Sequence, residues 1–227
     1  MASIRNKTSK QASGQGCLNT FIPSFLVLGL ALLAILIYGG FSLSTQTNAN
    51  DSKNILAQES ARLASFYAPT VLHWSKAVQT WAKEYDLDAN LIATVMQIES
   101  CGDPQALSSA GAQGLFQVMP FHFEAGENPS DPVTNAQRGL SYLKQSLEAS
   151  NGDIRKALAG YNGGISVVNQ LEEYWPSETR RYADWGSRIY NEASQGLNTS
   201  HTLQEWLNSG GSFLCGPASQ KLLTFKP

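Results

Sequence analysis

The sequence of 227 residues predicts a mainly α-helical domain with long connecting loops and a small hairpin region, preceded by one transmembrane helix. Three observations lead to this prediction. Apolar side chains recur at helical spacing in several segments, glycine- and serine-rich stretches separate these segments, and residues 21–41 form an uncharged apolar run. An apolar content of 42% is enough for a packed core.

The apolar run, FIPSFLVLGLALLAILIYGGF, would be about 31 Å long as a helix, close to the hydrocarbon thickness of a bilayer. Residues 1–20 carry three basic side chains and no acidic one. We therefore expect a single-pass protein of the cell membrane, with residues 1–20 in the cytoplasm and the chain after residue 41 outside it. The alternative is a signal peptide cleaved after Ala49, although the apolar core of such peptides is usually shorter.

Residues 42–68 are expected to form a tether, because their first part is rich in Ser, Thr and Asn, and the compact domain is expected over residues 69–193. Its first helix is indicated by four apolar side chains at helical spacing: Val71, Trp74, Val78 and Trp81. The second helix begins after Asp88, a good N-cap, and runs through LIATVMQIES. Residues 101–120, rich in Gly and Ser and closed by a proline, are expected to form a loop or a tight hairpin.

Three further helices are expected in the domain. One spans roughly residues 135–149, one starts at the N-cap Asp153 and ends at the sequence YNGG, and one runs from Pro176 to about residue 191. Residues 194–227 are expected to be a loop-like C-terminal tail with one short helix, indicated by a capping box from Thr202 to Glu205.

The second helix places a carboxylate on its apolar face. Glu99 follows Ile92 by seven residues and Val95 by four, so its side chain points the same way as theirs. Burial disfavours the charged form of a carboxyl group and raises its pKa, and a carboxyl group still protonated near neutral pH can act as a general acid. The alternative is a glutamate near a helix end that turns to solvent or meets an arginine.

Five segments, in this order and spacing, resemble the lytic transglycosylase family. They are the Glu-Ser pair of residues 99–100, SSAGAQGLFQVMP (108–120), DPVTNAQRGLSYL (131–143), GYNGG (160–164) and PSETRRY (176–182). The resemblance covers roughly residues 70–192 and implies a goose-type lysozyme fold for the domain.

The resemblance also implies which residues form the site. The catalytic acid and base of the family falls on Glu99, and the substrate-binding positions fall on Ser108, Gln117, Tyr161, Asn162, Glu178 and Tyr182. Each of these has a plainer interpretation as a turn residue, an exposed amide or a helix-end side chain. Phe116 stands where the family usually has methionine, which puts fine specificity in doubt more than the reaction.

The implied substrate is the peptidoglycan glycan strand, cleaved between N-acetylmuramic acid and N-acetylglucosamine without water to give a 1,6-anhydro product. This route needs one carboxyl group and no metal or organic cofactor. Two alternatives stay open: a lysozyme-like hydrolase, which needs a second carboxylate, and a non-catalytic peptidoglycan-binding module of an envelope-spanning machine. A net charge of −2 without a basic block argues against nucleic acid as a partner.

Two cysteines, Cys101 and Cys215, would share an oxidising compartment if the chain is exported, and a disulfide can persist there. The alternative is two unpaired thiols, because sequence spacing does not establish the geometry of a disulfide.

Overall fold

The structure is a computed structural model of the chain, and it describes residues 62–224. The apolar run at 21–41 and most of the expected tether lie outside this range. Within the range, no helix is long and apolar enough to cross a membrane.

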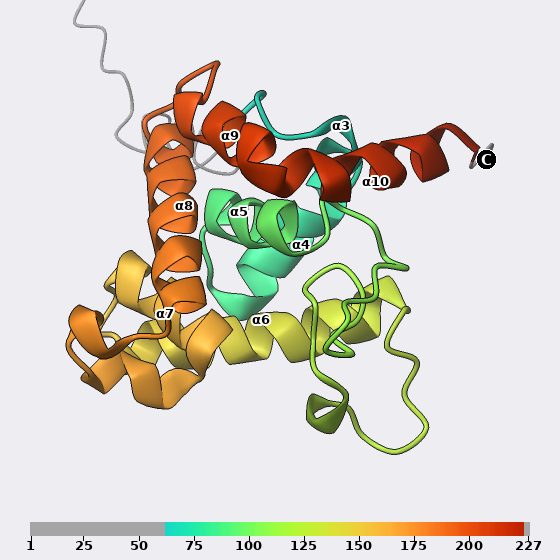
Figure 1. Cartoon of the computed structure of the whole chain (residues 1–227). Helices are drawn as coiled ribbons and strands as arrows, with labels where there is room; N and C mark the ends of the chain where they lie inside the picture. The colour runs from blue at the N-terminus through green and yellow to red at the C-terminus, as the bar shows by residue number, and fades with distance from the viewer. Residues whose placement is uncertain (1–61, 225–227) are drawn as a thin grey trace, which may run out of the picture. The chain divides into compact units, whose positions relative to one another are not determined.

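The described part of the chain is mainly helical (Figure 1). Its α-helices are α3 (Pro69–Leu72), α4 (Ser75–Tyr85), α5 (Ala89–Glu99), α6 (Pro132–Ala149), α7 (Ile154–Gly163), α8 (Ser177–Ser194), α9 (His201–Trp206) and α10 (Ser212–Thr224). Short 3-10 turns lie at Pro120–His122, Ile165–Asn169 and Glu172–Tyr174, and one π-helical turn at Leu207–Gly211. The predicted hairpin region contains two isolated bridges that share one residue, Leu107 with Gln113 and Gln113 with Val118.

Helix α5 lies in the middle of the domain, with α4 and α8 packed against it (Figure 1). The Asp88 side chain caps its first turn by accepting hydrogen bonds from the backbone N–H groups of Asn90 and Leu91 at 2.8 and 3.1 Å. All residues from Ala89 to Gln97 are buried, so the polar C-terminal end of the helix is the part that reaches a surface. This burial fixes the position of Glu99, the last residue of α5.

The chain turns sharply after α5. The Ser100 hydroxyl donates to the Leu115 carbonyl at 2.7 Å, which ties the end of the helix to the loop that follows it. Cys101 and Gly102 then take positive φ values of 51° and 80°. A Cβ atom on Gly102 would lie 2.6 Å from the Thr70 carbonyl oxygen, so only glycine allows α3 to approach this turn.

Two helix boundaries differ from the sequence prediction. The expected first helix is broken at residues 73–74 into α3 and α4. Helix α6 starts three residues earlier than expected, at Pro132, because the Asp131 carboxylate accepts from the backbone N–H of Thr134 at 2.8 Å and proline suits a first helical position.

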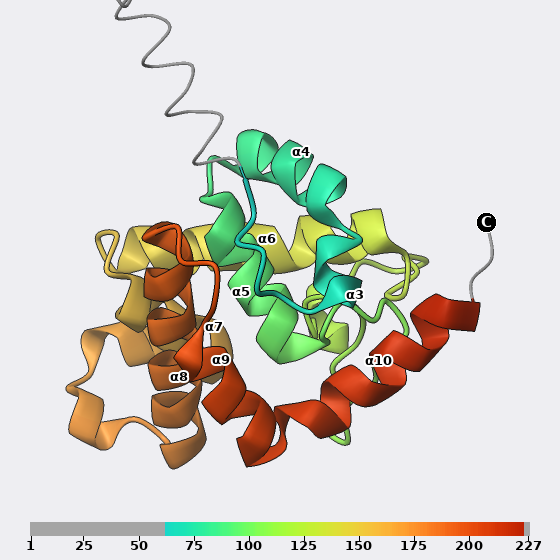
Figure 2. The ribbon, with the colours of Figure 1, turned by 90° about the horizontal axis from the view of Figure 1, so that it is seen from above.

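The prediction of one short helix in the tail is confirmed by α9, but the prediction that the rest of the tail is loop-like was wrong. Residues 201–224 are helical, and α9 packs on α8 while α10 lies beside α3 (Figure 2). The N-cap of α9 is Ser200, whose hydroxyl accepts from the Leu203 N–H at 2.8 Å, whereas Thr202 lies inside the helix and donates to Glu192. Packing also begins before the expected boundary at residue 69, since three apolar side chains ahead of it are buried: Leu63, Ala64 and Tyr67.

A disulfide joins Cys101 to Cys215 and so attaches α10 to the turn after α5. The Gln97 amide contacts both sulfur atoms at 3.1 and 3.3 Å. An ion pair between Asp103 and Lys221 at 2.5 Å lies farther along the same two segments. The C-terminal helices therefore belong to the packed unit and support the end of α5.

Candidate active site

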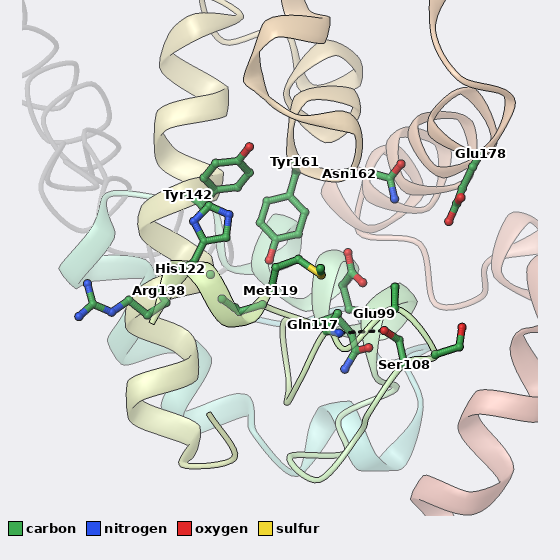
Figure 3. Close-up of a pocket in the computed structure, with 15 residues that line it drawn as sticks. Glu99, Ser108, Gln117, Met119, His122, Arg138, Tyr142, Tyr161, Asn162 and Glu178 are labelled. Carbon is green, nitrogen blue, oxygen red and sulfur yellow. Dashed lines mark hydrogen bonds between the residues drawn. The ribbon is translucent and has the colours of Figure 1, made fainter. Parts of the chain in front are cut away.

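Glu99 lies in a cleft of about 360 Å³. The cleft is formed by the end of α5, the loop of residues 108–122, one face of α6, the end of α7 and the first turn of α8 (Figure 3). It brings together six of the predicted site residues: Glu99, Ser108, Gln117, Tyr161, Asn162 and Glu178. The seventh, Tyr182, is buried on α8 and reaches Glu99 from behind the cleft wall.

The Glu99 side chain is partly open to the cleft, but protein atoms surround it on its other sides. This burial raises the pKa of Glu99 to about 8. The Tyr182 hydroxyl donates a hydrogen bond to Glu99 Oε1 at 2.7 Å, which favours the carboxylate and opposes the increase, while the negative charge of Glu178 adds to it. At neutral pH, Glu99 is therefore mostly a neutral acid that faces an open cleft.

Two tyrosines frame this acid. Tyr182 donates to Glu99, and Tyr161 donates to the Phe116 carbonyl at 2.8 Å. Burial raises the pKa of both phenols well above the ordinary value, so both stay protonated donors. A Cβ atom on Gly139 of α6 would lie 2.6 Å from Phe116 Cβ and 3.2 Å from the Tyr161 hydroxyl. A glycine at this position allows α6, the loop and Tyr161 to meet.

The loop of residues 108–122 is held by its own polar groups. The Ser108 hydroxyl accepts from the Ala112 N–H at 2.9 Å. Gln117 has a positive φ of 47°, and its amide nitrogen donates to the carbonyls of Ala106 and Gly114 at 3.2 and 3.1 Å. In this structure both predicted ligand-binding side chains therefore also stabilise the shape of the loop.

Asn162 is oriented by α8. Its carbonyl oxygen accepts from the Thr179 hydroxyl at 2.9 Å, which leaves the amide nitrogen for a ligand in the cleft (Figure 3).

Three other acidic residues of the domain have structural partners outside the cleft. Asp103 pairs with Lys221, and Asp131 and Asp153 cap α6 and α7. Among the described residues, the carboxylates that line the cleft are Glu99 and the exposed Glu178. The cleft thus holds one buried acid and one solvated carboxylate.

The residues that line the cleft and that the sequence analysis did not select include four with long or aromatic side chains: Met119, His122, Arg138 and Tyr142. Met119 and Tyr142 belong to the segments that carry the family resemblance, so that resemblance contained a signal for both. His122 follows the second of these segments, and its place depends on the 3-10 turn at Pro120–His122. Arg138 is fixed by Glu127, which accepts from its Nε and Nη2 at 2.9 and 2.6 Å.

Residues 76–182 match the family model described as Transglycosylase SLT domain. The transglycosylase of Enterobacteria phage PRD1 is 34% identical over 113 residues, which cover 49% of this chain and 40% of the phage protein. The membrane-bound lytic murein transglycosylase E of Buchnera aphidicola subsp. Acyrthosiphon pisum is 29% identical over 163 residues, which cover 63% of this chain and 71% of that protein. These comparisons confirm the resemblance to lytic transglycosylases.

A solved structure of an inactive mutant of the lytic transglycosylase Slt from Pseudomonas aeruginosa is 24% identical, with a TM-score of 0.44. The match covers 54% of this chain and 24% of that one. The present chain thus spans less than half the length of the phage relative and about a quarter of the Slt chain.

Proposed function

We propose, from the match of residues 76–182 to the transglycosylase SLT domain family, that this chain is a peptidoglycan lytic transglycosylase with Glu99 as its catalytic acid and base. The observation that carries the proposal is the buried carboxyl group of Glu99, whose pKa is raised to about 8 at the surface of a cleft. Such a group holds a proton at neutral pH and can transfer it to a bound substrate. A goose-type lysozyme fold for the domain belongs to the same proposal.

In the proposed reaction, Glu99 gives its proton to the glycosidic oxygen, and the bond from that oxygen to C1 of the muramic sugar breaks. The N-acetyl oxygen of the same sugar stabilises the positive charge at C1. The Glu99 carboxylate then takes the proton of the C6 hydroxyl, whose oxygen bonds to C1 and closes the 1,6-anhydro ring. No water is consumed, and Glu99 ends the cycle protonated, as it began.

Tyr182 supports both steps. When Glu99 has lost its proton, the hydrogen bond from Tyr182 stabilises the carboxylate. This lowers the cost of the first proton transfer without abolishing the basicity needed for the second. Ser108, Gln117, Tyr161, Asn162 and Glu178 are proposed to position the sugar and its acetamido group, a proximity role.

We also propose that residues 21–41 anchor the protein in the cell membrane with the catalytic domain outside the cytoplasm. The composition of that segment and the basic residues before it support this proposal. The name of the Buchnera relative, a membrane-bound lytic murein transglycosylase, is in line with it.

The products of peptidoglycan digestion test the reaction. The full chain in detergent micelles is incubated with purified peptidoglycan, and the released muropeptides are analysed by mass spectrometry. We expect products lighter by one water than hydrolytic ones and resistant to borohydride reduction. Reducible products would replace the proposal with a hydrolase, for which Glu178 is the candidate second carboxylate because it lines the same cleft. Glycan binding without release would indicate a non-catalytic module.

A further inference from the structure

A disulfide and an ion pair attach α10 to the turn that follows Glu99. Cys101 lies two residues beyond Glu99 and is bonded to Cys215, which is near the start of α10. Lys221, farther along α10, pairs at 2.5 Å with Asp103, which is buried. Because one helix holds the turn at two places, we call α10 the strap.

The disulfide also packs against α5 just before Glu99. Gln97, two residues before Glu99, is fully buried. Its amide nitrogen lies 3.1 Å from the sulfur of Cys101 and 3.3 Å from that of Cys215. The carbonyl oxygen of the same amide accepts from the Ala68 N–H at 2.9 Å. The disulfide therefore contacts the helix ahead of the acid and closes the turn behind it, which constrains the backbone of Glu99 from both directions.

The turn also begins the loop that lines the cleft. The Asp103 carboxylate accepts from a backbone N–H two residues ahead at 2.9 Å, which orders the start of this loop. The Gln117 amide nitrogen then donates to the Ala106 carbonyl at 3.2 Å. A movement of the turn would therefore displace both Glu99 and the loop of residues 108–122, which together carry the acid and part of the proposed substrate site.

The strap is separate from the helices that form the rest of the cleft. It packs chiefly on α3 and on the π-helical turn before it, whereas α6, α7 and α8 pack on one another. It also lies outside residues 76–182, which match the family model. The cleft helices therefore have packing of their own that does not depend on the Cys101–Cys215 bond.

We propose that the strap makes turnover depend on the redox state of Cys101 and Cys215. The disulfide-bonded chain is the active form, and the dithiol form stays folded but holds Glu99 and the loop loosely. A disulfide oxidant closes the bond: the two cysteine thiols and one small-molecule disulfide give the Cys101–Cys215 bond and two small-molecule thiols, and two electrons pass to the oxidant. This inference rests on the proposed function, because turnover is what the bond controls.

The burial of the bond gives the switch a direction. Cys101 is 0% and Cys215 8% exposed, and thiol–disulfide exchange depends on access to the sulfur atoms. A closed bond is therefore shielded from thiols in solution, so oxidation acts as an activation step that lasts. With the domain outside the cytoplasm, as proposed above, the chain becomes fully active in the compartment where disulfides persist.

Rate measurements on two redox forms of the full chain in micelles test the strap. All forms carry Cys17→Ala, so that the remaining thiols report on the pair, and alkylation with mass spectrometry verifies each form. We expect the form reduced with dithiothreitol to release muropeptides roughly tenfold to a hundredfold more slowly, since a misplacement of about 1 Å can cost about a hundredfold in rate. The matched control combines Cys101→Ala with Cys215→Ala, and it should be slow and insensitive to dithiothreitol.

The pH profile of the double alanine variant separates a loosened site from a smaller fraction of folded protein. Partial unfolding scales the rate at every pH. A loosened turn exposes Glu99 to water and lowers its pKa toward the ordinary value, so the alkaline limb should move to lower pH. The other ionisable side chains at the cleft are the same in both chains: His122, Arg138, Tyr142, Tyr161, Glu178 and Tyr182.

Three results would overturn the inference: equal rates in the two redox forms, a reduced chain that tryptophan fluorescence shows to be unfolded in the assay, or a slower variant with an unmoved alkaline limb. Hydrogen exchange of peptides over residues 97–106 is a readout without turnover, and we expect faster exchange there in the reduced form, with α6 to α8 unchanged. If the disulfide-bonded chain releases no anhydro product while this local difference is present, the proposed function fails and the control of the turn by the strap stands. Equal exchange in the two forms would overturn that control whatever the activity.

Discussion

Replacing Glu99, the proposed catalytic acid, should make this protein more stable at alkaline pH. Glu99→Gln keeps the shape of the side chain and an oxygen that accepts the hydrogen bond from Tyr182, but it removes the ionisable group. The unmodified protein must place a negative charge in a partly buried site once Glu99 ionises. The variant never does so.

The sign and size of the effect follow from the pKa of Glu99, which rises from an ordinary 4.5 to about 8 in the folded protein. Between these values the folded chain holds a proton that the unfolded chain has released, so the contribution of Glu99 to the free energy of unfolding falls as the pH rises. It is complete below about pH 4.5 and lost by the time the pH passes 8. At 1.36 kcal/mol for each pKa unit, the loss is about 3 kcal/mol at pH 7 and roughly 4–5 kcal/mol above pH 8.

Urea unfolding of both proteins at pH 5, 7 and 9, followed by tryptophan fluorescence, measures this contribution. The difference between the two chains cancels the groups that titrate in both. We expect nearly equal stability at pH 5 and a variant more stable by several kcal/mol at pH 9. Glu178→Gln is the control: it removes the other cleft carboxylate, and because that charge raises the pKa of Glu99, the pH dependence should persist in a weaker form. A stability difference that does not change with pH would refute the reasoning.

Three further changes follow from the same contacts. Tyr182→Phe removes the hydrogen bond that stabilises the Glu99 carboxylate, so the alkaline limb of the pH–rate profile should move to higher pH, and a move to lower pH would contradict this. Gly139→Ala places a methyl group against Phe116 and should cost about 1–3 kcal/mol of stability, measured by urea unfolding, together with a large loss of turnover; a variant of normal stability would show that the backbone adjusts. Cys215→Ala opens a disulfide that closes a loop over a sequence separation of 114, and should cost about 2–5 kcal/mol under oxidising conditions but nothing relative to the unmodified chain under reducing ones.

Neighbouring residues were enough to predict the start of α5 and its apolar face. Asp88 is a good N-cap and the apolar residues after it recur at helical spacing, and the structure contains both the cap and the buried helix. The early start of α6 had a signal too, because Asp131 is a cap followed by Pro132, but the sequence analysis placed the start of the helix near residue 135.

The tail shows where local signals mislead. Gly210, Gly211 and Pro217 are typical of loops, yet residues 201–224 are helical except for a kink at Gly210, whose φ is 125°. Their helices are stabilised by contacts with distant parts of the chain: the Cys215 disulfide and the burial of Trp206 and neighbouring apolar residues. No helical periodicity within the tail contains that information.

The candidate site also has a part that the sequence predicted and a part that depends on contacts between distant residues. Glu99 was selected from its place on an apolar helix face, and the remaining predicted residues from the family resemblance. The hydrogen bond from Tyr182 to Glu99 joins residues 83 positions apart, and spacing alone does not predict it. His122 reaches the cleft from the end of a 3-10 turn, and Arg138 is held at the cleft by an ion pair with Glu127. Both arrangements depend on how the loop folds back on α6.

The pH dependence of turnover tests the central claim, that a protonated Glu99 performs the proton transfer, most directly. Release of muropeptides from purified peptidoglycan by the full chain is measured from pH 5 to pH 10, alongside Glu99→Gln. We predict a rate that falls on the alkaline side with an apparent pKa near 8, and essentially no release by the variant at any pH. Substantial release by Glu99→Gln, with the same alkaline limb as the unmodified chain, would show that another group carries the proton.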